Sequence, residues 1–277
     1  MRKMLIKAAA FGLLSATVSV ASADPSADKA AFQKYFQDKF PNTEFQDFAN
    51  GVYSIDAASR AQWEEIEEFP PYEIAIEEGE SLYNKPFKNG KTYADCLPNK
   101  GIGIYQDYPK YDDKQGKVVT IELLINQCRK ANGEKPLKYK KGKMAALSAY
   151  LAYTARDKEF NVQIQNDAAK AAYEKGKQFF YARRGQLNMA CAHCHVDNSG
   201  KRIRADLLSP ALGHVTAFPV YRSKWGAMGT MHRRFGGCNK QVRAKPFKAQ
   251  SDEYRNLQYF LSYMSNGLKA NGPGVRK

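Results

Sequence analysis

The five residues "CAHCH" at positions 191–195 indicate which class of domain this 277-residue chain forms. A C-x-x-C-H run is the signature of covalent c-type haem attachment. The spacing suits that chemistry because Cys191 and Cys194 reach the two vinyl groups of one porphyrin while the imidazole of His195 turns onto the iron. A thioredoxin-like dithiol would follow a βαβ pattern, and a zinc site would use a second C-x-x-C; the sequence has neither. The motif therefore predicts a cytochrome c domain with covalent haem.

Two helical patterns flank the motif, as cytochrome c domains require. Residues 166–185 and 252–267 both carry apolar side chains at helical spacing. Each segment is expected to begin at an aspartate N-cap and to stop at a glycine, Asp167 and Gly185 in the first and Asp252 and Gly267 in the second. Cytochromes c cross their first and last helices at a glycine, and Gly176 is the expected crossing point here.

An internal repeat extends this plan to the whole chain. Shifting "PKYDDKQGKVVTIELLINQCRKANGEKP" (109–136) by 110 positions lays it on "PVYRSKWGAMGTMHRRFGGCNKQVRAKP" (219–246) without a gap. The identities include Pro109/Pro219, Tyr111/Tyr221, Gly116/Gly226, Thr120/Thr230, Cys128/Cys238 and Pro136/Pro246. The sequence therefore predicts a mainly α protein of two tandem cytochrome c-like domains, a haem-less one at 24–155 and a haem-binding one at 156–277.

The amino terminus indicates export. Residues 1–23 combine a basic start, a short apolar run and the small-residue ending Ala21-Ser22-Ala23, which together predict a cleaved secretory signal peptide. The alternative is an uncleaved anchor, although the run is short for a membrane span. No second long apolar run follows, so the mature chain is expected to be a periplasmic protein without an integral membrane segment.

The charge of the chain favours an anionic partner. The formal net charge is +15, or about +12 once the three cations of the leader are removed. Because an exported protein is separated from the nucleic acid of the cytoplasm, small oxyanions or an acidic protein are the better candidates for the anionic partner.

The three cysteines outside the motif are an odd number in an oxidising compartment. Cys96 aligns with the start of the haem motif, and Cys128 aligns with Cys238. In a domain without haem these two thiols face the same space, so we expect a disulfide between Cys96 and Cys128; two free buried thiols are the alternative. Cys238 is then left without a cysteine partner.

Cys238 is a candidate for the second axial ligand of the haem iron, opposite His195. Its competitors in the same half of the chain are Met228, Met231, His214 and His232. A methionine is the commoner ligand in an electron carrier, and a lone cysteine can be an inert core residue. The surrounding "RRFGGCNKQVRAKP" (233–246) is rich in cations, however, which suits a sulfur that receives an anion.

With "CAHCH", the repeat and "RRFGGCNKQVRAKP" together, the mature chain resembles the SoxA family, the c-type cytochrome subunits of SoxAX thiosulfate-oxidising complexes. The resemblance implies that Cys238 is both haem ligand and catalytic sulfur, carried as a persulfide. It also implies that Arg234 holds the substrate anion, with Arg243 a weaker candidate for the same work. Many members carry a second haem motif in the first domain; its lack here resembles the monohaem branch, with one covalent haem c.

The activity that the resemblance implies is that of an L-cysteine S-thiosulfotransferase. Thiosulfate would be joined oxidatively to a cysteine of the carrier protein SoxYZ, and the two electrons would pass to the haems of this chain and of a SoxX partner. A small third subunit is left open. The main alternative is a plain periplasmic electron-transfer cytochrome c, in which Cys238 is structural. A third class is a subunit whose haem only stabilises a complex.

Overall fold

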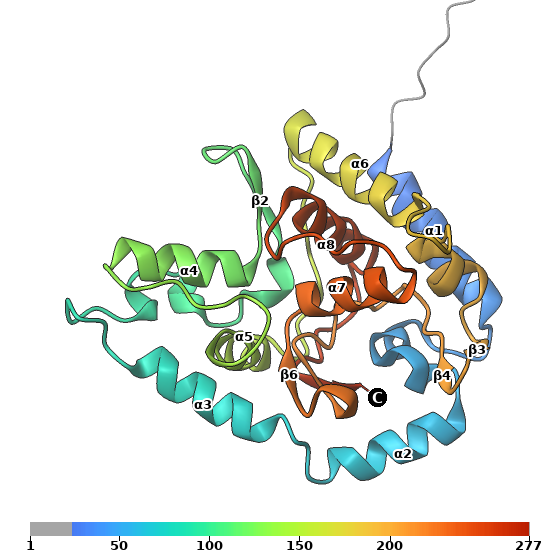
Figure 1. Cartoon of the computed structure of the whole chain (residues 1–277), viewed down its shortest axis with the longest axis horizontal. Coiled ribbons are helices and arrows are strands. Elements are labelled where there is room, and N and C mark those ends of the chain that lie inside the picture. The colour runs from blue at the N-terminus through green and yellow to red at the C-terminus, as the bar shows by residue number, and fades with distance from the viewer. Residues whose placement is uncertain (1–23, 277) are drawn as a thin grey trace, which may run out of the picture.

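The computed structural model describes residues 24–276, and they form a mainly helical protein with a few short strands (Figure 1). The α-helices are α1 (Pro25–Lys39), α2 (Ala57–Glu67), α3 (Glu73–Asn84), α4 (Ile121–Ala131), α5 (Lys143–Tyr153), α6 (Asp167–Tyr181), α7 (Met231–Gln241) and α8 (Asp252–Met264). The strands are β1 (Lys110–Asp112), β2 (Lys117–Val119), β3 (Arg202–Ile203), β4 (Asp206–Leu207), β5 (Val220–Arg222), β6 (Ala227–Gly229) and β7 (Gly274–Arg276). Shorter helical turns are η1 (Phe45–Ser54), η2 (Tyr93–Asp95), η3 (Pro98–Gly101), η4 (Tyr105–Asp107), η5 (His193–Asp197) and η6 (Ser223–Trp225).

The predicted signal peptide, residues 1–23, lies outside the described residues. Among residues 24–276, no helix has both the length and the apolar character needed to cross a bilayer.

The repeat predicted from the sequence recurs in the structure with the same offset of 110 residues. In the first half the antiparallel hairpin β1–β2 leads into α4, and in the second half the hairpin β5–β6 leads into α7. The two helices begin at Ile121 and Met231 and have the same length. The second hairpin is extended by β7, which pairs with β5 in parallel and so brings the C-terminal segment next to it.

Glycines allow the first and last helices of each half to cross closely. A Cβ built on Gly176 of α6 would lie 2.0 Å from the carbonyl oxygen of Asn256 in α8, so only glycine fits at this contact. In the first half a Cβ on Gly79 of α3 would lie 2.1 Å from the oxygen of Ala146 in α5. Figure 1 shows α3 alongside α5 and α6 alongside α8. The crossing expected at Gly176 is therefore confirmed, and the first half repeats it.

The predicted ends of α6 and α8 were wrong by a few residues. The N-cap of α6 is Asn166, whose Oδ1 accepts from the Ala169 N–H at 2.9 Å, and α6 ends at Tyr181 before Gly185. Ser251 precedes α8, which places Asp252 inside its first turn, where the carboxylate pairs with Arg255. An acid in the first turn interacts favourably with the helix dipole without capping it, and this explains the one-residue error.

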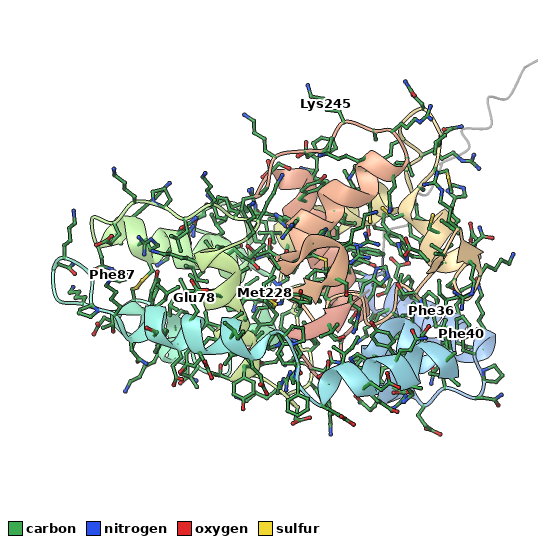
Figure 2. All side chains as sticks on the ribbon, turned by 60° about the horizontal axis from the view of Figure 1, so that its bottom comes forward. Phe36, Phe40, Glu78, Phe87, Met228 and Lys245 are labelled. Carbon is green, nitrogen blue, oxygen red and sulfur yellow. A yellow bond between two sulfur atoms is a disulfide. The ribbon has the colours of Figure 1, made fainter. Side chains whose placement is uncertain are left out.

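The N-terminal helix α1 packs on the second half of the chain. The ring of Phe32 contacts that of Phe260 edge-on, and Gln33 donates hydrogen bonds to the carbonyls of Met264 and Asn266. Figure 2 labels Phe36 and Phe40 at this end of the molecule, and both rings contact that of Phe48 in η1. A single buried cluster contains core residues from both halves, so the domain boundary at 155/156 stays a prediction.

Candidate functional site

The backbone around Ser209 sets the orientation of the His195 ring. The Nδ1 of His195 lies 3.0 Å from the carbonyl oxygen of Ser209, so Nδ1 carries the proton and donates. The same segment also binds the His195 backbone, because the Ala211 N–H donates to the His195 carbonyl at 2.9 Å. With Nδ1 protonated, Nε2 is left with a lone pair for a metal.

His214 lies against His195 without competing for its place. The two rings meet edge to face with 4.3 Å between centroids. The Nε2 of His214 is engaged by the hydroxyl of Ser209 at 2.8 Å. Burial, and then the neighbouring His195 and Arg234, lower the pKa of His214 well below its usual range. His214 is therefore a neutral packing partner of the His195 ring.

Three free thiols converge beside His195. Cys191, Cys194 and Cys238 are half-buried, and none of them is in a disulfide. Burial raises the pKa of Cys191 to about 12, and the proximity of Cys238 adds to the shift; the pKa of Cys194 is raised by the same two causes. Two thiols spaced for thioether bonds, a histidine with Nε2 available and a third sulfur suit the attachment and ligation of haem c.

Helix α7 presents Cys238 and Arg234 together. Residues four apart lie on one helix face, so the guanidinium of Arg234 stands one turn before the thiol. Burial by itself would raise the pKa of Cys238, but Arg234, then His195 and then Arg222 outweigh it, and the pKa falls to about 7. A substantial fraction of the sulfur is therefore thiolate near neutral pH, which is the nucleophilic and metal-binding form.

The other candidate ligands named by the sequence lie elsewhere. Met228 is buried in a cluster with Tyr72 and Ala145 of the first half, and Figure 2 shows it inside the molecule near α3. Met231 belongs to the main core. The Nδ1 of His232 accepts a hydrogen bond from the Gln250 N–H, away from His195. Among the five candidates, Cys238 forms a side-chain hydrogen bond with His195, and this bond is one of the causes that lower the pKa of the thiol.

The loop that follows α7 packs directly on the residues that precede the haem motif. Gly185 has φ +69°, and a Cβ there would lie 2.1 Å from the carbonyl oxygen of Val242. The Leu187 N–H also reaches this oxygen, at 3.4 Å. The cation-rich stretch and "CAHCH" are thus adjacent in space.

Arg222 is a site residue that the sequence analysis missed. It lies at the end of β5, is 8% exposed, and its charge interacts with both Arg234 and Cys238. Burial, then Arg234, lower its pKa to about 10, so it remains cationic. The repeat aligns Arg222 with Asp112 of the first half, and this reversal of charge could have identified Arg222 as a site residue from the sequence.

The predicted substrate residue Arg243 is placed differently. It is exposed on the turn after α7 with φ +56°, whereas the charges that lower the pKa of Cys238 are those of Arg234, His195 and Arg222. Lys245, further along the same loop, projects outward at the edge of the molecule (Figure 2). Arg243 and Lys245 therefore belong to the exposed loop after α7 and not to the immediate surroundings of the thiol.

In the first half, Cys96 and Cys128 are joined by a disulfide with 5.7 Å between their Cα atoms, the pairing that the repeat predicts. Cys128 occupies the position on α4 that Cys238 occupies on α7. The aromatic side chains of Phe87 and Tyr93 pack together in the same half, with ring centroids 4.8 Å apart.

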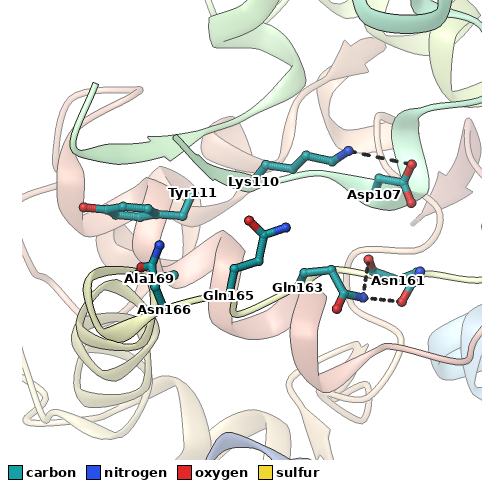
Figure 3. A pocket seen from close by; sticks show the side chains of 8 residues that line it. All are labelled: Asp107, Lys110, Tyr111, Asn161, Gln163, Gln165, Asn166 and Ala169. Atoms are coloured by element: carbon teal, nitrogen blue, oxygen red, sulfur yellow. Dashed lines mark hydrogen bonds and ion pairs between the residues drawn. The ribbon is translucent and has the colours of Figure 1, made fainter. Parts of the chain in front are cut away.

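A separate cavity of about 230 Å³ lies between the β1 hairpin and the start of α6 (Figure 3). Its lining is polar and includes Lys110, Tyr111, Gln163 and Gln165. None of the free cysteines or histidines lines it, so it is distinct from the thiol site. Within residues 24–276, no group of three or more His, Cys, Asp or Glu side chains forms a site for a free metal ion.

The chain is similar to known proteins over most of its length. The family model described as SoxA/TsdA, cytochrome c domain, matches residues 78–160 and 175–270. The chain is 57% identical to L-cysteine S-thiosulfotransferase subunit SoxA of Allochromatium vinosum, over 93% of this chain and 92% of that protein. It is 54% identical to the protein of that name from Chlorobaculum tepidum, over 91% and 87%. A solved structure, SoxXA from P. pantotrophus, aligns with a TM-score of 0.72 and 32% identity over 78% of this chain and 84% of that one.

Proposed function

The chain belongs to the SoxA/TsdA cytochrome c family, and from that premise we propose how its own residues perform the activity of a thiosulfate-oxidising cytochrome subunit. The relatives are named as L-cysteine S-thiosulfotransferase subunits, and a cytochrome c domain implies covalently bound haem c. One observation carries the proposal for the site: the thiol of Cys238 interacts with the His195 side chain of the haem motif and with the charges of Arg234 and Arg222.

We propose that the chain binds one haem c. Cys191 and Cys194 would form the thioethers, and His195, oriented by the Ser209 carbonyl, would supply one axial ligand. Cys238 would supply the other. The first half has a disulfide where a second haem would need a thiol, since Cys96 is already bonded to Cys128.

The mass of the intact protein tests this stoichiometry. We expect the holoprotein that starts at Asp24 to weigh as much as its chain plus one haem, less two hydrogen atoms for the disulfide. After reduction the mass should rise by those two hydrogen atoms while the haem remains attached, because thioether bonds resist reductants. A mass corresponding to two haems would contradict the proposal.

The net chemistry joins two sulfur atoms by oxidation. The carrier cysteine thiolate and the outer sulfur of thiosulfate form an S–S bond, and two electrons leave the pair, so the product is a cysteine S-thiosulfonate. When bound, the haem of this chain would accept one of those electrons, and the haem of a SoxX partner would accept the other. Cys238 would act as the covalent relay for sulfur, since its lowered pKa provides thiolate in place.

The two arginines would hold the sulfonate end of thiosulfate. Arg234 lies one turn from Cys238 on the same helix face, and Arg222 reaches the thiol from strand β5. Guanidinium groups form paired, charge-assisted hydrogen bonds with oxyanions. Because both cations act on one sulfur, we expect them to bind the anion jointly and to direct its outer sulfur toward Cys238.

Replacing Arg234 by alanine should therefore impair thiosulfate use without removing the haem. Loss of one charge-assisted hydrogen bond costs about 1.5–3 kcal/mol, which corresponds to a fall in kcat/KM of roughly ten- to a hundredfold. Steady-state thiosulfate oxidation with carrier present measures it. Arg234→Lys should recover part of the loss, because it keeps the charge and loses the planar fork.

The exposed Lys240, on the same helix, provides the matched control for charge alone. Lys240→Ala should stay within about twofold of wild type, since an isolated exposed charge contributes little at moderate salt. Arg243→Ala decides the weaker sequence prediction: a loss as large as that of Arg234→Ala would place Arg243 at the substrate. Equal rates for Arg234→Ala and wild type would remove Arg234 from the site.

We also propose the assembly and compartment. The structural relative is a SoxXA complex, which supports a SoxX cytochrome as partner, and the activity named for the relatives requires a carrier cysteine such as that of SoxYZ. The leader-like residues 1–23 and the disulfide support a periplasmic location.

A further inference from the structure

A buried chain of hydrogen bonds links the two halves of the protein and ends on the helix of Cys238. The hydroxyl of Thr120, at the start of α4, donates to Oε1 of Gln250 at 3.0 Å. The backbone N–H of Gln250 donates to Nδ1 of His232 at 3.0 Å. His232 lies in the first turn of α7, and all three residues are at most 9% exposed. The chain therefore connects the first half of the protein to α7 without passing through solvent.

A reciprocal contact occurs at the positions related by the repeat. Thr230, just before α7, donates through its hydroxyl to the Tyr139 carbonyl at 2.9 Å and through its N–H to the Lys140 carbonyl at 3.3 Å. Thr120 and Thr230 are 110 residues apart, as are Lys140 and Gln250. Each half thus holds the start of the other half's helix, in the manner of a two-fold symmetric interface.

Helix α7 needs external support more than α4 does. Its middle contains Gly236 and Gly237, whereas α4 has Asn126 and Gln127 at the corresponding positions. Two interior glycines lower the intrinsic stability of a short helix. One face of α7 carries Arg234 and Cys238, and the other carries buried side chains that include His232. A shift of the buried face would therefore move the thiol.

The surroundings of His232 suit an acceptor that stays uncharged. Its ring packs against those of Phe235, with 5.8 Å between centroids, and Tyr254, with 5.6 Å, and these two rings also contact each other. Burial, then the charge of Arg255, lower the pKa of His232 to about 3. Nδ1 therefore remains available to accept from Gln250 across the physiological range.

We propose that His232 is a positioning residue for the reaction: by accepting the Gln250 N–H, with Gln250 held in turn by Thr120, it sets where α7 places Cys238 relative to His195. This inference rests on the proposed role of Cys238 as haem ligand. It gives the haem-less half a function, because that half supplies Thr120 and the carbonyls that hold Thr230.

The test compares His232→Leu with His232→Asn in the full-length holoprotein. Leucine fills much of the same volume but leaves the buried Gln250 N–H without an acceptor, whereas asparagine can place Oδ1 near the position of Nδ1. For His232→Leu we expect loss of a major part of the electron paramagnetic resonance signal of low-spin ferric haem with thiolate ligation. We also expect amide exchange in α7 to be roughly ten- to a hundredfold faster. His232→Asn should recover both towards wild type.

Asn126→Ala is the matched control in the first half. Asn126 is 1% exposed on α4 and exchanges two hydrogen bonds with Leu137, so it fastens its own helix to the loop that follows. This variant should lower the melting temperature and speed exchange in α4, yet leave the ligation signal unchanged. Thr120→Val should shift the signal in the same direction as His232→Leu, and Thr120→Ser, which keeps the hydroxyl, should not.

Cys238→Ala distinguishes the proposed ligand role of Cys238 from the proposed positioning role of His232. If Cys238→Ala leaves the ligation signal unaltered, the proposed ligand role of Cys238 is wrong. If Cys238→Ala abolishes the signal while His232→Leu retains it and shows wild-type exchange in α7, only the positioning role is overturned. Equal spectral losses in His232→Leu and Asn126→Ala would also overturn it, since they would report general destabilisation.

Discussion

Cys238→Ala should yield a folded, haem-loaded protein that has lost all thiosulfate-dependent conjugation to a carrier cysteine. The haem should remain because its proposed covalent attachment uses Cys191 and Cys194, and because His195 is oriented by the Ser209 carbonyl, which α7 does not supply. The activity should be lost because no other described thiol would be available for the relay in the holoprotein: Cys96 and Cys128 are bonded to each other, and Cys191 and Cys194 would be taken by the proposed thioether bonds. We expect the loss to be complete rather than partial, since removing a covalent nucleophile removes the route and not one contact along it.

Three measurements on the same preparation check this expectation. Mass spectrometry reports the haem, circular dichroism reports the fold, and the mass of the carrier protein reports conjugation. Cys238→Ser serves as a size-matched control that keeps a hydroxyl, and it should be equally inactive because an alcohol is not ionised at neutral pH. A plain electron-transfer cytochrome would show no thiosulfate requirement in either variant. Conjugation that persists in Cys238→Ala would refute the catalytic role of this cysteine.

Gly176→Ala should produce a large loss of stability in the second half of the chain. The added Cβ would meet the Asn256 oxygen at 2.0 Å, its carbonyl carbon at 2.6 Å and the Phe260 Cβ at 2.9 Å. Two of these atoms are backbone, so α6 and α8 would have to move apart. Overpacking of this kind costs about 1–3 kcal/mol, and for a chain of this size we expect the melting temperature to fall by roughly 3–12 °C.

Two further glycines make the test specific. Gly79→Ala should cause a comparable loss, because its Cβ would lie 2.1 Å from the Ala146 oxygen at the equivalent crossing. Gly237→Ala should be neutral or slightly stabilising, since no atom lies within 4 Å of its Cβ and alanine favours a helix. If Gly176→Ala and the wild type had the same melting temperature, the close crossing of α6 and α8 would be wrong.

Local features of the sequence were enough to predict much of this protein. The spacing of "CAHCH" is set by one porphyrin, so the cofactor can be read from five adjacent residues. The offset of 110 residues predicted two similar helical halves and aligned Cys128 with Cys238. A separate similarity upstream aligned Cys96 with Cys191, and the two alignments together predicted the disulfide between Cys96 and Cys128. Arg234 and Cys238 could be placed on one face from helical periodicity alone. In each case the information lies within one element or in a comparison of two aligned segments.

The surroundings of each candidate ligand were visible only in the tertiary structure. Met228, Met231, His214 and His232 are all close to Cys238 in sequence, yet each is engaged in the core or in a hydrogen bond. Arg222 reaches the thiol from a hairpin sixteen residues earlier, while Arg243, only five residues away, is on the exposed turn. Which side chain faces a shared space depends on how β5, α7 and the haem-motif segment pack together. That packing is governed by contacts between residues distant in sequence, and no periodicity within a single segment records it.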